Sequence, residues 1–261
     1  MSKFAEVDEK LSTRRILYVD IERQAGLAHI FDQRTSGFIP AAKWVRRPSM
    51  LCFSAKWRSQ RTVQFYSAWQ DPDEMLAASW RLYDEADIVV GYNIIRFDDK
   101  WFRTFWRDNG LPPTRPFKSV DLYRVNKNLF GADSYSLAEL CRSLGVPSKA
   151  GHYDPFDADA CMEGDEVAQR RTERYSKQDT RILEPVHDKL LPWIHNHPVV
   201  NPTVGDELRC NRCGSTELTA CPNDYPAEVL TYAMYRCDKC RGIVVARHHK
   251  SRIGRVKGVK P

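Results

Sequence analysis

The sequence lacks any long apolar run. Its longest ones, such as DIVVGY at residues 87–92, have the length of a buried strand. They fall far short of the roughly 20 residues that a membrane-spanning helix needs. The first residues, MSKFAEVDEK, are charged and lack the apolar core of a signal peptide. We therefore expect a cytoplasmic protein with no membrane partner.

The sequence also lacks internal repeats and low-complexity tracts, and its composition is that of a globular protein. Its 261 residues, 42% hydrophobic and 28% charged, allow one or two domains with a substantial core. In a reducing cytosol the eight cysteines are not expected to form structural disulfides. Clustered cysteines are therefore interpreted as metal ligands or redox groups.

Acidic residues are missing from the end of the chain, where RHHKSRIGRVKGVK occupies residues 247–260. Residues 201–261 carry 11 Lys and Arg against 6 Asp and Glu, whereas the first 200 residues carry 29 against 28. A basic tail on a near-neutral body predicts contact with a polyanion such as nucleic acid. The alternative is a solvated tail that only adds solubility.

Hydrophobic periodicity and turn signals predict a mixed α/β sheet flanked by helices. The segment at 26–33 is expected to be the hairpin partner of the first strand, and Pro185 is expected to interrupt or kink the last helix. The predicted strands lie at 15–22, 26–33, 50–57, 62–69, 87–93 and 118–124, and the predicted helices at 71–86, 97–110, 136–146 and 163–191.

Carboxylates recur at three places on these elements. Asp20 and Glu22 lie two apart on a strand and share a face, where a divalent metal is the natural partner unless that face is in water. Asp98 and Asp99 lie where a loop enters a helix. The alternative to a functional role is that either carboxylate only stabilises the helix by interacting with the positive end of its dipole. In YSKQDT, residue 175 is a tyrosine placed one helical turn before Asp179; a solvent-facing turn is the alternative.

Taken together, D-x-E, N-x-x-x-F-D and Y-x-x-x-D resemble the motifs of the DEDD 3′–5′ exonucleases of the DnaQ-like group, in the subclass whose last motif contains tyrosine. The resemblance covers roughly residues 14–194. It implies a ribonuclease H-like fold and two Mg²⁺ or Mn²⁺ ions held by four carboxylates. The implied metal ligands are Asp20, Glu22, Asp98 and Asp179.

The resemblance also assigns roles around these carboxylates. Tyr175 would position the attacking water, or help to deprotonate it, and Asn93 and Phe97 would contact the substrate. Asp98 is preferred to Asp99 because it follows Phe97 in the family pattern. We interpret a further acid, Asp121, as a helix cap or salt-bridge partner.

The cysteine pairs CNRC and CDKC, separated by 23 residues, predict a structural Zn²⁺ site in a zinc ribbon. Two redox dithiols are the alternative, but the surrounding pattern of a thioredoxin-like protein is missing. Residues 228–237 and 242–249 are the expected ribbon strands. The predicted zinc ligands are Cys210, Cys213, Cys237 and Cys240; the remaining cysteines are interpreted as buried small residues (Cys52, Cys141 and Cys161) and a spare residue (Cys221).

These observations predict an N-terminal extension (1–14), an exonuclease domain (15–195), a linker (196–208), a zinc ribbon (209–247) and a basic tail (248–261). The expected function is 3′–5′ hydrolysis of DNA, single-stranded in preference, during replication proofreading or repair. Polymerase motifs are missing, so the protein would act as a free nuclease or as a partner of a polymerase. The resemblance to this family further implies the cytoplasm of a bacterial or phage-infected cell. The alternatives are an RNA-processing exonuclease, a structure-specific endonuclease and a non-catalytic nucleic-acid-binding adaptor.

Overall fold

The computed structural model describes residues 14–30, 38–147, 154–198, 208–227 and 230–252. The chain divides into two compact units. One spans Arg15–His187, and the other contains the four-cysteine sheet near the carboxyl terminus. Across these described ranges, no helix combines the length and the apolar character needed to cross a membrane.

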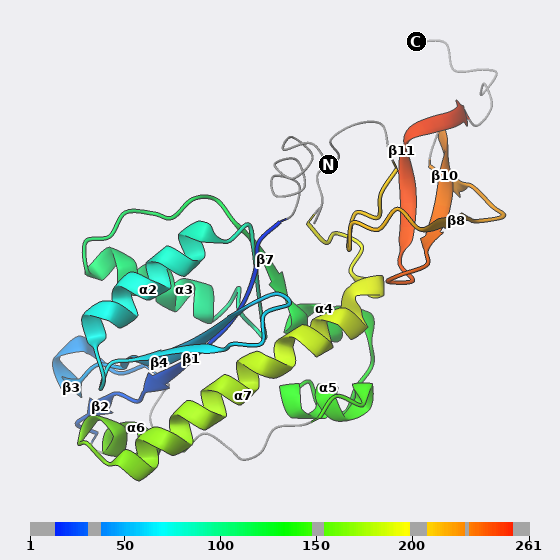
Figure 1. The fold of residues 1–261 in the computed structure, drawn as a ribbon. Helices are drawn as coiled ribbons and strands as arrows, with labels where there is room; N and C mark the ends of the chain where they lie inside the picture. Colours follow the sequence, from blue (N-terminus) through cyan, green and yellow to red (C-terminus); the bar gives the residue numbers. More distant parts are fainter. Residues whose placement is uncertain (1–13, 31–37, 148–153, 199–207, 228–229, 253–261) are drawn as a thin grey trace. The chain divides into compact units, whose positions relative to one another are not determined.

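The Arg15–His187 unit is built on a five-stranded mixed sheet, ordered β5-β4-β1-β6-β7 (Figure 1). β1 is central, antiparallel to β4 and parallel to β6. β5 extends the antiparallel side, and β7 extends the parallel side. The strands are β1 (Ile16–Gln24), β4 (Ser49–Trp57), β5 (Gln64–Ser67), β6 (Ile88–Gly91) and β7 (Lys118–Asp121).

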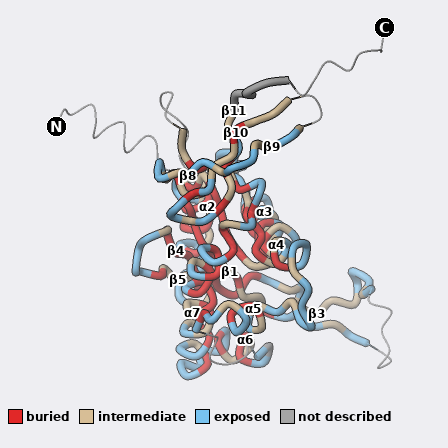
Figure 2. Tube along the Cα trace, turned by 90° about the vertical axis from the view of Figure 1, so that its right-hand side faces the viewer, coloured by how far each residue is buried: buried red, intermediate tan, exposed pale blue. Residues whose placement is uncertain are grey.

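Both faces of this sheet are covered by helices, which confirms the predicted mixed α/β sheet flanked by helices. On one face, Leu17, Val19 and Ile21 of β1 join a core formed with α2 (Pro72–Glu85) and α3 (Asp98–Asp108). Aromatic rings dominate this core, and Tyr83 contacts Phe102 and Trp106. Figure 2 shows buried residues concentrated along β1 and β4.

The opposite face of β1 carries the side chains in between, which include Asp20 and Glu22. The long helix α7 (Glu166–Leu190) lies over this face, opposite α2 and α3 (Figure 1). Asp20 and Glu22 are therefore half-buried beneath a helix. The alternative, that these acids lie on a face of the strand open to water, therefore does not hold.

Several helices begin and end where the sequence predicted. Asp71 caps α2 by accepting hydrogen bonds from the backbone N–H groups of Asp73 and Glu74. Ser136 caps α5 (Leu137–Leu144), and Gly145 ends it in the left-handed conformation, with φ of 63°. The sequence analysis missed α4 (Leu122–Leu129) and α6 (Pro155–Met162). It also missed two short 3₁₀ turns, Ala41–Lys43 and Leu191–Trp193.

Two predictions about the chain path are wrong. The segment after β1 does not pair with it: β2 (Leu27–Ala28) pairs with β3 (Trp44–Arg46), and β4 pairs with β1 along one edge from Leu17 to Gln24. Residues 31–33 of the predicted partner strand lie outside the described residues. The predicted strand at 118–124 ends at Asp121, which caps α4 instead.

Helix α7 runs from Glu166 to Leu190 and passes through Pro185 without ending. Proline inside a helix removes one backbone hydrogen bond and costs about 3 kcal/mol. On either side of it, however, Glu184 forms an ion pair with Lys56 and the ring Nδ1 of His187 lies 3.0 Å from the Tyr18 hydroxyl. These contacts anchor both flanks of Pro185 to the sheet.

The other unit contains an antiparallel sheet, ordered β11-β10-β8, with β9 also paired to β10. It confirms the small C-terminal β unit predicted from the cysteine pattern. Residues 228–229 of the first predicted ribbon strand lie outside the described residues. The strands are β8 (Leu218–Ala220), β9 (Tyr225–Pro226), β10 (Leu230–Cys237) and β11 (Ile243–Arg252).

Candidate functional site

Three carboxylates meet where α7 crosses β1. Asp20 and Glu22 come from the strand and Asp179 from the helix, and each offers an oxygen such that the three lie within 4.8 Å of one another. Asp179 is buried, and the two strand acids are half-buried. The fold thus brings together acids that are 157 and 159 residues apart in the sequence.

The Tyr175 hydroxyl lies beside this carboxylate cluster (Asp20, Glu22 and Asp179). Burial raises the pKa of Tyr175 well above its usual value, and the negative charges of Asp179, Glu22 and Asp20 raise it further. The hydrogen bond with Asp179 acts in the same direction. Tyr175 therefore keeps its proton at physiological pH and can act as a hydrogen-bond donor, not as a base.

Asp98, the fourth predicted metal ligand, lies next to the cluster but does not join the group within 4.8 Å. It is buried at the start of α3, and its Oδ1 accepts a hydrogen bond of 3.1 Å from the backbone N–H of Ile21, the residue between the two strand acids. Burial raises the pKa of Asp98 to about 8, with a smaller contribution from Asp99 and Asp121. Its carboxyl is thus held at β1 in an environment that disfavours its charge.

Asp99 has a structural environment that Asp98 lacks. It accepts hydrogen bonds from the hydroxyls of Tyr83 (3.2 Å) and Ser119 (2.6 Å), and Arg103 lies 3.9 Å away. These contacts tie α3 to α2 and β7. Both of its oxygens are already engaged within the fold, so Asp98 is the better candidate for a metal ligand.

Asp121 organises the loop that leads to Asp98. Its two carboxylate oxygens accept from the backbone N–H groups of Asn93 (3.0 Å) and Ile95 (3.3 Å). It also caps α4 through Arg124 N–H and forms an ion pair with the Arg124 guanidinium at 3.6 Å. This confirms the interpretation of Asp121 as a cap and salt-bridge residue.

Asn93 and Phe97 occupy opposite ends of this loop. Asn93 is half-buried with φ of 64°, a left-handed conformation that asparagine tolerates better than most residues. Phe97 is exposed, and the Arg23 guanidinium lies 5.8 Å from its ring centre and 3.4 Å from that of Trp101. The residue that directly follows Glu22 on β1 is therefore an arginine whose guanidinium lies over the Trp101 ring and near the Phe97 ring. The sequence analysis did not identify Arg23, because nothing in its local pattern indicates the ring partners.

The carboxylate cluster suits a divalent cation. Its donors are all oxygens, which hard cations such as Mg²⁺ and Mn²⁺ prefer. Bringing three carboxylates so close together is unfavourable unless positive charge compensates them. The observed donor set is therefore compatible with the implied ions, with Asp98 adjacent as a further oxygen donor.

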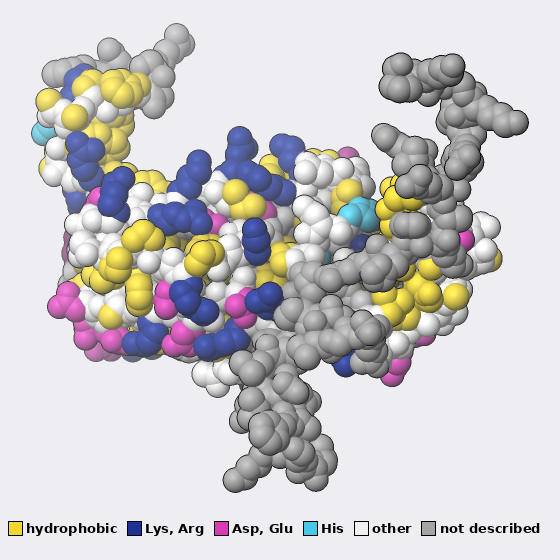
Figure 3. Space-filling view, turned by 90° about the horizontal axis from the view of Figure 1, so that it is seen from above, with side chains coloured by type: hydrophobic (Ala, Val, Ile, Leu, Met, Phe, Trp, Pro, Cys, Tyr) yellow, Lys and Arg dark blue, Asp and Glu magenta, His cyan; other side chains and the backbone are white. Residues whose placement is uncertain are grey.

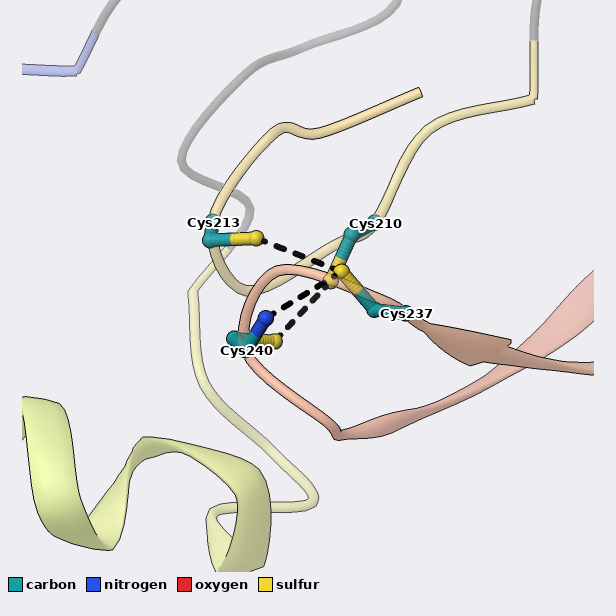
Figure 4. A group of neighbouring side chains, drawn as sticks. All are labelled: Cys210, Cys213, Cys237 and Cys240. Atoms are coloured by element: carbon teal, nitrogen blue, oxygen red, sulfur yellow. Dashed lines mark hydrogen bonds between the residues drawn. The ribbon is translucent and has the colours of Figure 1, made fainter. Parts of the chain in front are cut away.

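The second candidate metal site is the four-cysteine cluster (Cys210, Cys213, Cys237 and Cys240) shown in Figure 4. The sulfur atoms of Cys210 and Cys240 are 3.6 Å apart, as are those of Cys213 and Cys237. Four thiolates around a tetrahedral Zn²⁺, with Zn–S bonds of about 2.3 Å, would have sulfurs about 3.8 Å apart. The cluster is consistent with a structural zinc site.

Each cysteine pair closes a tight turn. The N–H of Gly214 donates to the Cys210 carbonyl, and the N–H of Arg241 donates to that of Cys237, both at 2.8 Å. Gly214 and Arg241 both adopt the left-handed conformation, with φ of 77° and 66°. Gly242 follows the second turn and leaves room for the Arg212 side chain, because a Cβ at residue 242 would lie 3.0 Å from it.

Arg212, between the first two cysteines, is a structural residue that the sequence analysis did not recognise. It is buried, and its Nε donates to the Ile194 carbonyl at 2.9 Å, while Nη1 donates to the carbonyl of Ile243. It thereby joins the first cysteine turn to β11 and to the segment that follows α7.

Lys and Arg side chains are frequent on the side of the Arg15–His187 unit that carries α2 and α3. In Figure 3, Lys and Arg side chains gather across the middle of the face, whereas many Asp and Glu side chains lie toward one edge. A cleft of about 390 Å³ between α3 and the loop before β7 is lined by Arg103, Arg107 and Arg115, together with apolar side chains.

No family model matches the chain, and no curated protein matches its sequence. Among solved structures, the chain is similar to the family B DNA polymerase from the hyperthermophilic archaeon Pyrobaculum calidifontis, with a TM-score of 0.50 and 17% sequence identity. The similarity covers 69% of this chain and 25% of the polymerase chain, so this chain spans about a quarter of the length of that structure. At this identity the likeness is one of fold.

Proposed function

We propose that this protein is a metal-dependent 3′–5′ exonuclease that removes nucleotides from the 3′ end of DNA. The observation that carries the proposal is the convergence of Asp20, Glu22 and Asp179 within 4.8 Å, with the Tyr175 hydroxyl beside them. The similarity of fold to a DNA polymerase supports a nucleic-acid substrate.

The residues of the site would have three roles: binding the metal ions, orienting the attacking water and contacting the substrate. Asp20, Glu22, Asp98 and Asp179 would hold two Mg²⁺ or Mn²⁺ ions, and Asp98 would change least in position because the Ile21 N–H already fixes it. Ions bound there would neutralise charge on the scissile phosphate and acidify a water molecule. Tyr175, which stays protonated, would orient that water by hydrogen bonding. Asn93 and Phe97 would contact the terminal nucleotides.

The four-cysteine unit would serve binding and not catalysis. A tetrahedral site with four protein thiolates leaves no position open for substrate, so Zn²⁺ held there would be structural. The unit and the basic residues after it would add contacts to nucleic acid or to a replication protein.

The experiment uses full-length protein with Mn²⁺ or Mg²⁺ and a 5′-labelled single-stranded DNA. A 3′–5′ exonuclease yields a descending ladder of labelled products and leaves circular single strands intact. Asp20→Ala should abolish cleavage, and matched DNA and RNA strands decide the substrate class. The proposed activity would be excluded if neither linear DNA nor linear RNA were cleaved with either metal, or if Asp20→Ala cleaved as fast as the wild-type protein. Cleavage of circular single strands would indicate an endonuclease instead.

A further inference from the structure

Ser54 is on β4, beside the strand and beneath the helix that supply the carboxylate cluster. On β4 it is the direct cross-strand partner of Asp20. Its side chain is fully buried and projects to the face that α7 covers. No feature of the local sequence distinguishes it from any other serine in a strand.

The Ser54 hydroxyl is bound to two turns of α7. It donates to the Ser176 carbonyl at 2.8 Å and accepts from the Ser176 hydroxyl at 2.9 Å. The hydroxyl oxygen of Thr180 lies 2.6 Å from that of Ser54, and Thr180 is also placed to donate to the Ser54 carbonyl at 3.2 Å. All three residues are fully buried, so water does not compete for these hydrogen bonds.

The two helix residues that Ser54 contacts are sequence neighbours of the candidate site. Ser176 follows Tyr175, and Thr180 follows Asp179. One side chain therefore links the strand position opposite Asp20 to both functional turns of the helix. We propose that Ser54 is a positioning residue, which sets the placement of Tyr175 and Asp179 over the β1 carboxylates. This inference rests on the proposed exonuclease function.

Directional contacts are needed here because apolar packing alone is a weak constraint on a helix. Hydrophobic contacts are non-directional and tolerate small rotations or shifts, whereas hydrogen bonds weaken steeply when distance and angle change. The ion pair between Lys56 and Glu184 continues the polar attachment one turn farther along α7. A helix attached in this way has one preferred rotation and register on the sheet.

The test compares two buried serines in the full-length protein. Ser79, on α2 at the other face of the sheet, is also fully buried; it donates to the Leu76 carbonyl and accepts from the Trp106 ring N–H, both at 2.8 Å. Ser54→Ala and Ser79→Ala should both lower the melting temperature. Well below that temperature, only Ser54→Ala should lower kcat, by about 10- to 100-fold, because small misplacements of reacting groups are costly.

Two further measurements separate positioning from a general loss of stability. Mn²⁺ affinity, measured without nucleic acid, should fall several-fold in Ser54→Ala and stay unchanged in Ser79→Ala, with little change in KM for either variant. Thr180→Val, which keeps the side-chain shape but loses the hydroxyl, should behave like Ser54→Ala. Thr180→Ser, which keeps the hydroxyl, should retain near wild-type kcat.

The outcomes distinguish this inference from the proposed function. If wild-type protein cleaves and binds Mn²⁺ but Ser54→Ala matches Ser79→Ala in both, the positioning role is wrong and the exonuclease proposal stands. If Thr180→Val retains wild-type kcat, the positioning role is likewise wrong. Wild-type protein that neither cleaves nor binds Mn²⁺ overturns the proposed function and this inference with it.

Discussion

Asp98 provides a quantitative test of the metal site, because its protonation and metal binding compete. Burial raises its pKa to about 8 in the metal-free protein. At pH 6 about 1% of the Asp98 side chains would be ionised, and at pH 8 about half. If a divalent ion needs the charged form, its apparent affinity should rise about 50-fold between these pH values, which corresponds to about 2.3 kcal/mol.

Protonation of Asp98 also makes the stability of the folded protein depend on pH. Because the pKa of Asp98 is raised on folding, the folded metal-free protein binds more protons than the unfolded chain between about pH 4 and pH 8. The contribution of Asp98 to the free energy of unfolding therefore falls as the pH rises through this range. Added Mn²⁺ reverses this trend, so the increase in melting temperature that it causes should be larger at pH 8 than at pH 6.

The assay is Mn²⁺ titration at fixed ionic strength from pH 6 to pH 8, followed by the electron paramagnetic resonance signal of the free ion. Asp98→Asn keeps an oxygen that can accept from the Ile21 N–H, so it should fold but bind Mn²⁺ weakly and with a much flatter pH dependence. Asp99→Asn is the matched control and should retain the steep dependence. A wild-type affinity that changes less than about threefold over this range would refute the role of Asp98 as a ligand that must lose its proton.

Four further predictions concern the other residues and the four-cysteine cluster. Tyr175→Phe should lower kcat roughly tenfold or more while Mn²⁺ affinity is retained, since it removes only an orienting donor; a wild-type rate would exclude that role. Asp179→Ala should abolish both cleavage and high-affinity Mn²⁺ binding, and retention of either would remove it from the ligand set. Chelation of zinc should unfold the four-cysteine sheet, seen as rapid amide exchange in β10, while β1 stays protected. Gly242→Ala should weaken zinc retention by displacing Arg212, as judged by competition with a chromogenic chelator.

Much of the fold could be predicted from local patterns. Caps such as Asp71, Ser136 and Gly145 act within one helical turn, so their effects are visible in the sequence. Strand pairing is different, because β1 could be recognised as a strand without any indication of which strands occupy its edges. The segment that is nearest in sequence is the natural candidate for a partner, but β4 takes one edge of β1 from Leu17 to Gln24.

The helix α7 illustrates how tertiary contacts override a local signal. Pro185 predicts an interruption, and its backbone cost is real. The compensating contacts, Lys56 with Glu184 and Tyr18 with His187, join residues more than 100 positions apart. A local pattern cannot contain such contacts. The sequence therefore indicates where the helix loses a backbone hydrogen bond, but not the contacts that stabilise the helix there.

The two candidate metal sites also differ in how much of each can be predicted from local sequence. The four cysteines form two short pairs, and each pair builds its own turn, so spacing alone determines most of the site. The carboxylates come from three separate elements, and motifs can specify which acids belong together but not the distances between them. Those distances depend on the rotation of α7 against β4. A single buried serine opposite Asp20 holds both turns of the helix that carry the tyrosine and the last aspartate. The residue that determines the geometry of the site therefore lies outside every motif that predicts the site.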